Sequence, residues 1–385
     1  MVEWKQYELG QICDYIRDRI QTVENYISTE NMLPNKGGIY ETITIPSGTV
    51  TVYQVGDILV SNIRPYFRKI WYADRDGGCS ADVLCIRAKD NVDSKYLYYL
   101  LSQQAFFDYV MSGAKGCKMP RGDKNQIMQW PVSLPPLAEQ KRIAAILGSL
   151  DDKIELNRRI NANLEEQAQA LFKSWFVDFE PFRDGPFVDS ELGKIPQGWK
   201  VGDIYTYLDV IYGAPYKSAL FNTDKKGYPL IRIRDLKTFL PQFYTEEILP
   251  NTEYVDSGDI VAGMDAEFVP YIWKGERGLL NQRVCKFMPK YDYVSKYYIL
   301  SLIRPTLEFV QSYKVGTTVS HLGKSDIDKF KVIIPPAEIV KRFSGIVDSF
   351  HQQIIKLAKE NLNLSALCDT LLPKLMAGEI NVENQ

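Results

Sequence analysis

The sequence predicts a tandem duplication in which a mixed α/β domain is followed by a long helix, twice over. Two observations predict this architecture. Apolar residues follow a heptad repeat over 143–175, and the same pattern returns about 200 residues later, over 343–375. The segments ahead of the two helices share short motifs, such as a Gly-Asp-Ile turn at Gly56 and again at Gly258. We expect the two helices to bury their apolar seams on each other, as an antiparallel coiled coil with pseudo-two-fold symmetry.

The seam of this coiled coil consists of residues spaced alternately by four and three positions. Pro135 and Pro136 precede the first helix, and Pro335 and Pro336 precede the second, where a missing N–H is tolerated best. The seam residues are Ile143, Leu147, Leu150, Ile154, Asn157, Leu164, Leu171 and Trp175 in the first helix, and Phe343, Val347, Phe350, Ile354, Asn361, Leu364, Leu371 and Leu375 in the second.

One antiparallel register places Trp175 on Phe343 and puts Asn157 opposite Asn361 near the pseudo-two-fold axis. A polar pair at one seam layer fixes the register of a coiled coil at some cost in stability. The alternative is that the seam asparagines, Asn157 and Asn161, are solvated edges of the seam.

The repeat divides the chain into four parts. We expect a first globular domain over 1–134 and a central helix over 135–180. A linker and the second globular domain follow over 181–334, and a C-terminal helix with its tail occupies 335–385. The linker stretch 177–198 is rich in proline and glycine and too broken for a helix.

Within the first domain, alternating apolar residues predict strands and a later segment has helical periodicity. That segment begins with a serine, Ser94, suited to capping. The expected strands are 49–55, 58–63, 70–73 and 83–87, and the expected helix is 94–110. Residues 199–333 repeat this plan.

Length and composition narrow the class of protein. With 385 residues and a formal net charge of −2, the chain has room for two or three soluble domains, and an acidic partner would be met by local basic patches. The six cysteines form no CxxC pair and only two histidines are present, which disfavours a zinc site or a disulfide framework. The N-terminus lacks the apolar core of a signal peptide, so we expect a soluble cytoplasmic protein.

Motifs that carry catalysis are almost absent. The stretch 316–325 resembles a phosphate-binding loop, but it reads GxxxxxxGKS where GxxxxGK[ST] is required. No nucleophile elbow, HExxH helix or GxGxxG fingerprint occurs. We therefore expect no catalytic residue, no metal site and no cofactor bound by this chain.

Basic residues mixed with aromatic and hydroxyl side chains gather in loops of both globular domains. Arginine can read guanine edges, and lysine and threonine bind phosphates. A basic loop is more often solvated surface than a binding face, but matching loops in both halves favour binding. The candidate DNA contacts in the first domain are Arg17, Arg19, Arg64, Tyr66, Arg68, Lys69, Lys115, Lys118, Arg121 and Lys124. Those in the second domain are Tyr216, Lys217, Arg232, Arg234, Lys237, Thr317, Thr318, His321 and Lys324.

Two stretches resemble the specificity subunits of Type I restriction-modification systems. Residues 134–182, beginning LPPLAEQKRIAAIL, are similar to their central conserved helix, and residues 367–380, LCDTLLPKLMAGEI, are similar to their C-terminal end. The order of recognition domain, helix, recognition domain and helix covers essentially the whole chain. The helical motifs are specific, whereas the loops are not.

This resemblance implies a non-catalytic DNA-recognition subunit. Each target recognition domain would bind one half of a bipartite sequence through the major groove of double-stranded DNA, and the helix pair would fix the spacer. Two modification subunits, which bind S-adenosylmethionine and methylate adenine, would dock on this chain, and restriction subunits would join them. The near-neutral net charge is a mild departure from the expectation for a DNA-binding protein.

A second class of function stays open, a coiled-coil scaffold that holds protein partners and binds no DNA. A fused methyltransferase and specificity chain is a third, but it needs a catalytic domain for which the chain has no room. The salt dependence of binding distinguishes the first two classes, because DNA binding weakens steeply as the salt concentration rises and apolar docking does not.

Overall fold

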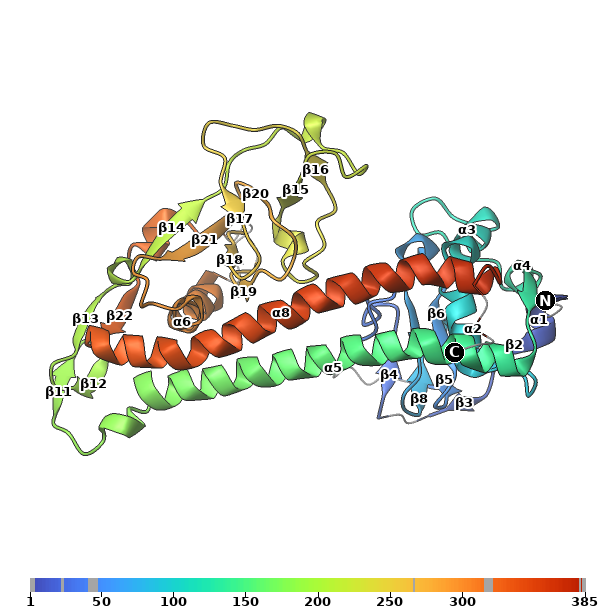
Figure 1. The fold of residues 1–385 in the computed structure, drawn as a ribbon, viewed down its shortest axis with the longest axis horizontal. Helices are drawn as coiled ribbons and strands as arrows, with labels where there is room; N and C mark the ends of the chain where they lie inside the picture. The colour runs from blue at the N-terminus through green and yellow to red at the C-terminus, as the bar shows by residue number, and fades with distance from the viewer. Residues whose placement is uncertain are drawn as a thin grey trace. The chain divides into compact units, whose positions relative to one another are not determined.

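The computed structural model describes residues 4–21, 24–40, 48–265, 267–314, 321–380 and 382. It forms two compact units (Figure 1), the first made of Met1–Lys153 with Leu364–Gln385 and the second of Ile154–Asn363. Each unit contains one globular domain together with part of each long helix. A mixed α/β domain followed by a long helix occurs twice, which confirms the predicted fold class.

The first domain is built on an antiparallel sheet with the strand order β2-β9-β6-β7. All four residues of β6 are buried, because one face of the sheet meets a helical layer and the other meets a second sheet. The strands are β2 (Cys13–Tyr15), β9 (Val83–Ala88), β6 (Ile58–Ser61) and β7 (Ile70–Tyr72), and the helices are α2 (Ser94–Leu101) and α3 (Gln104–Ser112).

The second sheet of this domain has the order β3-β5-β8-β4, with β4 parallel to β8. A small core fills the space between the two sheets, where the rings of Tyr53 and Trp71 pack edge to face at 5.8 Å. The strands are β3 (Arg19–Ile20), β5 (Val50–Tyr53), β8 (Gly77–Cys79) and β4 (Tyr26–Ile27).

A two-stranded ribbon connects the domain to the central helix. β1 (Lys5–Glu8) pairs with β10 (Pro131–Leu134), and the short helices α1 (Leu9–Ile12) and α4 (Lys124–Met128) contact each other beside it. The chain passes directly from β10 into α5 (Leu137–Phe176).

The second domain repeats this plan. Its main sheet has the order β14-β21-β18-β19, its second sheet the order β16-β15-β20-β17, and β13 pairs with β22 as the ribbon. The strands of the main sheet are β14 (Leu208–Tyr212), β21 (Val284–Pro289), β18 (Ile260–Gly263) and β19 (Pro270–Ile272). The others are β16 (Tyr244–Thr245), β15 (Tyr228–Ile231), β20 (Gly278–Leu280), β17 (Tyr254–Val255), β13 (Lys200–Asp203) and β22 (Lys331–Ile334), and the helices are α6 (Lys296–Lys314), α7 (Lys324–Ile327) and α8 (Ala337–Met376).

The structure departs from the expected elements in one helix, in the linker and in further short strands, such as β3 and β4, that lie outside the expected segments. The helix expected over 94–110 is interrupted at Ser102 and Gln103 and continues as α3, whereas α6 runs on through Pro305. The broken stretch 177–198 contains a short 3-10 turn, η2 (Glu180–Phe182), and a hairpin of β11 (Phe187–Ser190) with β12 (Gly193–Pro196). Neither strand of this hairpin was expected from the sequence.

Within the second unit, α5 and α8 run antiparallel and their seams meet. The rings of Trp175 and Phe343 lie 5.8 Å apart, and Asn157 donates a hydrogen bond to Asn361 at 2.9 Å. These are the contacts of the register expected from the sequence, and Asn157 is fully buried, so the interpretation of this residue as a solvated edge is wrong.

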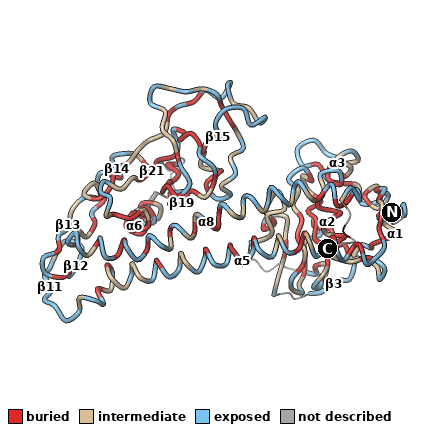
Figure 2. The backbone as a smooth tube through the Cα atoms, in the orientation of Figure 1, coloured by how far each residue is buried: buried red, intermediate tan, exposed pale blue. Residues whose placement is uncertain are grey.

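Within the first unit, the other parts of the two helices share a core with α2 and α3. Ile143 and Leu147 of α5 are buried in it together with Leu375 of α8. Every predicted seam residue of both helices is buried or partly buried, and Figure 2 shows buried positions recurring along each helix between exposed ones. No helix in the described part of the chain is both long and apolar enough to cross a membrane.

Candidate nucleic-acid interface

The first domain presents a short turn of basic and aromatic residues directly after β6. The 3-10 helix η1 (Pro65–Phe67) is flanked by Arg64 and Arg68, and both arginines adopt the left-handed conformation, with φ of 48° and 53°. Non-glycine residues rarely occupy that region, so the surrounding structure must hold them there. Tyr66 and Phe67 are exposed at the tip of the turn. We call residues 64–69 the η1 turn.

A second basic loop, residues 115–124, is bound to the η1 turn by backbone hydrogen bonds. Ile63 forms an isolated β-bridge with Arg121, and the N–H of Arg64 donates to the carbonyl of Pro120 at 2.8 Å. The side chain of Asn62 also donates to the carbonyl of Gly122 at 3.2 Å. Two of the sequence-predicted clusters therefore form one surface.

The cations of this surface are arranged in different ways. Lys115 forms a salt bridge with Asp123 at 3.1 Å, and hydrogen bonding to Lys115 lowers the pKa of that carboxyl. Arg121 pairs with Asp82 at 3.1 Å, and Lys69 donates to the carbonyl of Thr29 at 2.6 Å. Lys118 and Lys124 are exposed.

Arg17 and Arg19 lie elsewhere in the domain. Both are exposed, and Arg19 belongs to β3, where its guanidinium lies 3.4 Å from the hydroxyl of Thr49. Among the described residues, no hydrogen bond or salt bridge connects either arginine to the η1 turn. The structure therefore does not join this predicted cluster to the other two.

The second domain has the same junction of two loops. Asp265, which follows β18, forms an isolated β-bridge with His321, and these residues are the counterparts of Ile63 and Arg121. The N–H of Leu322 donates to the carbonyl of Met264 at 2.7 Å. Nδ1 of His321 lies 2.6 Å from the carboxylate of Asp265, which also pairs with Arg283 at 3.4 Å.

An ion pair connects the loop of Arg232, Arg234 and Lys237 to the segment that follows Asp265. Lys237 lies 2.7 Å from Glu267, two residues beyond Asp265. The guanidinium of Arg232 lies over the ring of Phe243 at 5.0 Å, and burial lowers its pKa. Arg234 and Lys237 are exposed.

The remaining candidates of the second domain differ in position. Tyr216 is buried in a small core and its hydroxyl lies 3.1 Å from that of Thr252, so its side chain lies inside the fold. Lys217 is exposed. Lys324 is exposed and bonds Asp328 at 3.0 Å. Thr317 and Thr318 lie outside the described residues.

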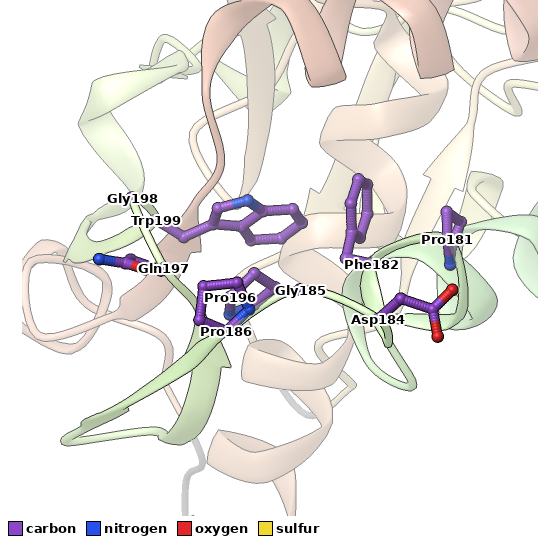
Figure 3. A pocket seen from close by; sticks show the side chains of 9 residues that line it. All are labelled: Pro181, Phe182, Asp184, Gly185, Pro186, Pro196, Gln197, Gly198 and Trp199. Atoms are coloured by element: carbon purple, nitrogen blue, oxygen red, sulfur yellow. The ribbon is translucent and has the colours of Figure 1, made fainter.

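A shallow pocket of about 470 Å³ lies in the linker of the second unit, apart in sequence from the basic loops. Phe182 and Trp199 lie in its wall (Figure 3), where their rings pack edge to face with centroids 5.0 Å apart. Proline and glycine residues form most of the rest of the lining, which offers little to bind a charged ligand. We therefore interpret this pocket as a gap left where the linker packs on Trp199, and not as a binding site.

Sequence reasoning missed several residues that the structure places at these surfaces. Phe67 is exposed beside Tyr66, and the run Pro-Tyr-Phe between two arginines could have indicated it. Asp265 and Glu267 were missed because acidic side chains do not suggest DNA binding, although they hold cations in place. Among the described residues, no group of three or more potential metal ligands occurs.

Comparison with known proteins places the chain in a family. Residues 1–166 and 196–364 match the family described as the Type I restriction modification DNA specificity domain. The specificity subunit of Type I restriction enzyme MjaIX from Methanocaldococcus jannaschii is 32% identical over 324 residues, which cover 77% of this chain and 71% of the relative. That of HindI from Haemophilus influenzae is 26% identical over an alignment of 465 residues, covering 99% of this chain and 100% of the relative.

A crystal structure of the S subunit of a Type I restriction-modification system from M. genitalium aligns with 97% of this chain and 96% of its own, at 15% identity and a TM-score of 0.49. Since the family match covers most of both globular domains and most of both long helices, the chain belongs to the Type I restriction-modification DNA specificity family and is a non-catalytic subunit that gives such a system its DNA target specificity.

Proposed function

We propose that each globular domain reads one half of a bipartite target in double-stranded DNA, and that the loops joined at the two β-bridges make the contacts. One observation carries this proposal. The bridge between Ile63 and Arg121 recurs between Asp265 and His321, so the same junction is built twice on the same fold with different side chains. A repeated platform with divergent loops suits the recognition of two unlike half-sites.

The two platforms differ in charge. The first carries Arg64, Arg68 and Lys69, which can hydrogen-bond to guanine edges or to phosphates. The second carries Asp265 and Glu267, which orient the basic side chains beside them. We therefore expect the two domains to read different bases.

The paired helices would set the spacer between the half-sites. α5 and α8 contain 40 residues each, which corresponds to roughly 60 Å of helix. Half-sites one turn of DNA apart are separated by about 34 Å. A pair of helices of this length has the reach to hold two domains on such a target.

As a member of this family, the chain acts in a Type I restriction-modification complex on DNA. We propose that its direct partners are two modification subunits, joined by restriction subunits, in the cytoplasm. The modification subunits would supply S-adenosylmethionine and methylate adenine. The chain itself would hold no cofactor and would determine only where the complex acts.

The test is to co-express the chain with its modification subunit and to map methylation of the host DNA at single-base resolution. Residues 232–237 would then be exchanged for the corresponding loop of another specificity subunit. We expect a bipartite motif that changes in one half only. Exchange of 64–69 should change the other half, and alanine substitution of Lys194 in the β11–β12 hairpin serves as the control.

Unchanged methylation after both exchanges, in complexes that still assemble, would show that these loops do not read DNA. The alternative of a scaffold that binds only protein partners would be favoured if the complex bound target and non-target DNA equally at every salt concentration. Loss of both halves of the motif after a single exchange would argue against independent half-site recognition.

A further inference from the structure

We propose that the rings of Tyr66 and Phe67 read the methyl group of a thymine in the half-site of the first domain. This inference rests on the proposed function and adds a chemical group that the basic residues cannot recognise. Thymine is the base that presents an apolar methyl group in the major groove, so it is the natural partner of an apolar tip.

The two rings form an exposed apolar tip. Tyr66 is 48% exposed and Phe67 is 39% exposed, and their ring centroids lie 4.7 Å apart. Keeping two adjacent aromatic rings in water is unfavourable unless they bury surface on a partner. Proline at position 65 is buried and anchors the start of the turn.

The fold holds this tip rigidly. The carbonyls of Phe67 and Arg68 accept hydrogen bonds from the N–H groups of Asn35 and Lys36 at 2.8 and 3.0 Å. Asn35 and Lys36 are themselves left-handed, with φ of 54° and 60°. With Arg64 and Arg68, four strained non-glycine residues meet here. Strain of this kind persists where surrounding contacts impose it, and it gathers at binding sites.

The charges around the tip favour DNA as the partner. Arg64 and Arg68 flank the rings, and the bridged loop adds Arg121 and Lys118. Among the described residues, no acceptor bonds the buried Nε of Arg64 or Arg68. A buried donor without an acceptor is unfavourable, so each guanidinium gains if its other nitrogens find acceptors on a partner. A phosphate or a guanine edge supplies acceptors beside the rings.

The equivalent turn of the second domain lacks these features. Phe268 follows the second β-bridge, but it is 1% exposed and belongs to the core. The charged residues that precede it are Asp265 and Glu267 rather than arginines. Among the described residues, the aromatic tip therefore has no counterpart at the second β-bridge, and its effect should be confined to one half-site.

The experiment uses the full chain in complex with its modification subunits. The DNA is a duplex that contains the target sequence identified by methylation mapping. Each thymine of the target is replaced in turn by deoxyuridine, which removes only the methyl group. Dissociation constants are measured for each duplex. We expect one or more positions in a single half-site to bind about three- to five-fold more weakly without the methyl.

The Phe67→Ala complex should bind the thymine and deoxyuridine duplexes equally, because the contact that distinguishes them is gone. Phe67→Leu, which keeps an apolar side chain, should retain part of the difference, and Tyr66→Phe should retain it fully. Tyr291→Ala is the matched control, since Tyr291 is 47% exposed and stacks on Tyr293 in the other domain. That variant should discriminate as the unsubstituted complex does.

The deoxyuridine measurement on the unsubstituted complex needs no protein variant, so a folding defect cannot obscure it. The inference is wrong, while the proposed function stands, if no thymine methyl in either half-site affects binding. The same holds if the half-site that changes on exchange of residues 64–69 contains no thymine. Discrimination that survives in Phe67→Ala also overturns it. Absence of any binding to target DNA would overturn the proposed function itself.

Discussion

Asn157 donates a hydrogen bond from its side-chain amide to that of Asn361 at 2.9 Å, across the seam between α5 and α8. Two further bonds flank this pair: Asn161 donates to the carbonyl of Ile354, and Asn361 donates to the carbonyl of Ile154, both at 3.2 Å. Donors and acceptors in these two bonds are related by the 200-residue offset of the repeat. A shift of either helix by one heptad would break all three bonds and leave buried amides without partners.

Replacing Asn157 alone by leucine should lower the free energy of unfolding by about 1–2 kcal/mol, because the side-chain oxygen of Asn361 loses its donor. Leucine at both positions should restore the stability or exceed it, since an apolar seam layer needs no hydrogen bonds. Urea unfolding of the three proteins measures this. A double variant less stable than Asn157→Leu would contradict the argument.

Asp57 is buried at the turn before β6, where it accepts bonds from Nε and Nη2 of Arg87, both at 2.7 Å, and from the N–H of Gln54 at 2.8 Å. Arg87→Met should destabilise the chain by about 3 kcal/mol, because it leaves a buried carboxylate unpaired. Adding Asp57→Asn should recover part of that loss, since burying a neutral amide costs less free energy than burying a carboxylate. Thermal unfolding compares the single and double variants. Equal stability of Arg87→Met and the unsubstituted chain would refute a role for this pair.

His351 on α8 is buried, with Lys296, Asp259 and the backbone of Gly258 around its ring, and burial together with the charge of Lys296 lowers its pKa to about 4. An unfolded histidine titrates near 6.5. As pH falls from about 6.5 to about 4, the unfolded chain takes up a proton that the folded chain does not, so the free energy of unfolding falls over that window.

The stability difference between the unsubstituted chain and His351→Leu should therefore shrink by about 2 kcal/mol between pH 7 and pH 5. Urea unfolding at several pH values measures it. If the free energy of unfolding of the two proteins changed with pH in parallel, His351 would not be the group that causes the loss of stability. Ser349→Ala, at an exposed position on the same helix, should give a profile like that of the unsubstituted chain.

Much of the fold was predictable because its strongest features are local. The seam of α5 and α8 repeats every seven residues, and the register follows once both seams are aligned about one polar layer. Strands β5, β6, β7 and β9 lie almost entirely within the segments expected from alternation. The hairpin β11–β12 was missed because its strands, such as Phe187–Ser190, are short and exposed and show no alternating pattern.

The candidate site was less predictable, because it depends on contacts between distant segments. Nothing in the sequence says that Ile63 pairs with Arg121, or Asp265 with His321. Composition identified Arg64 and its neighbours but equally selected Tyr216, whose burial in the fold is set by packing. The exposed Phe67 was recoverable from its neighbours, whereas the left-handed backbone at Arg64 was not.

Phosphate contacts in the first domain should show as a change in salt dependence. Lys118 is exposed on the loop bridged to the η1 turn, where a lysine can reach a phosphate but carries no base specificity. Lys118→Ala should weaken binding to target and non-target DNA by a similar factor and reduce the slope of log K against log salt by about 0.9. Lys194→Ala removes the same charge from the β11–β12 hairpin and should leave the slope unchanged. Equal effects of both variants would mean that the response reports net charge, and that residues 115–124 do not contact the backbone of DNA.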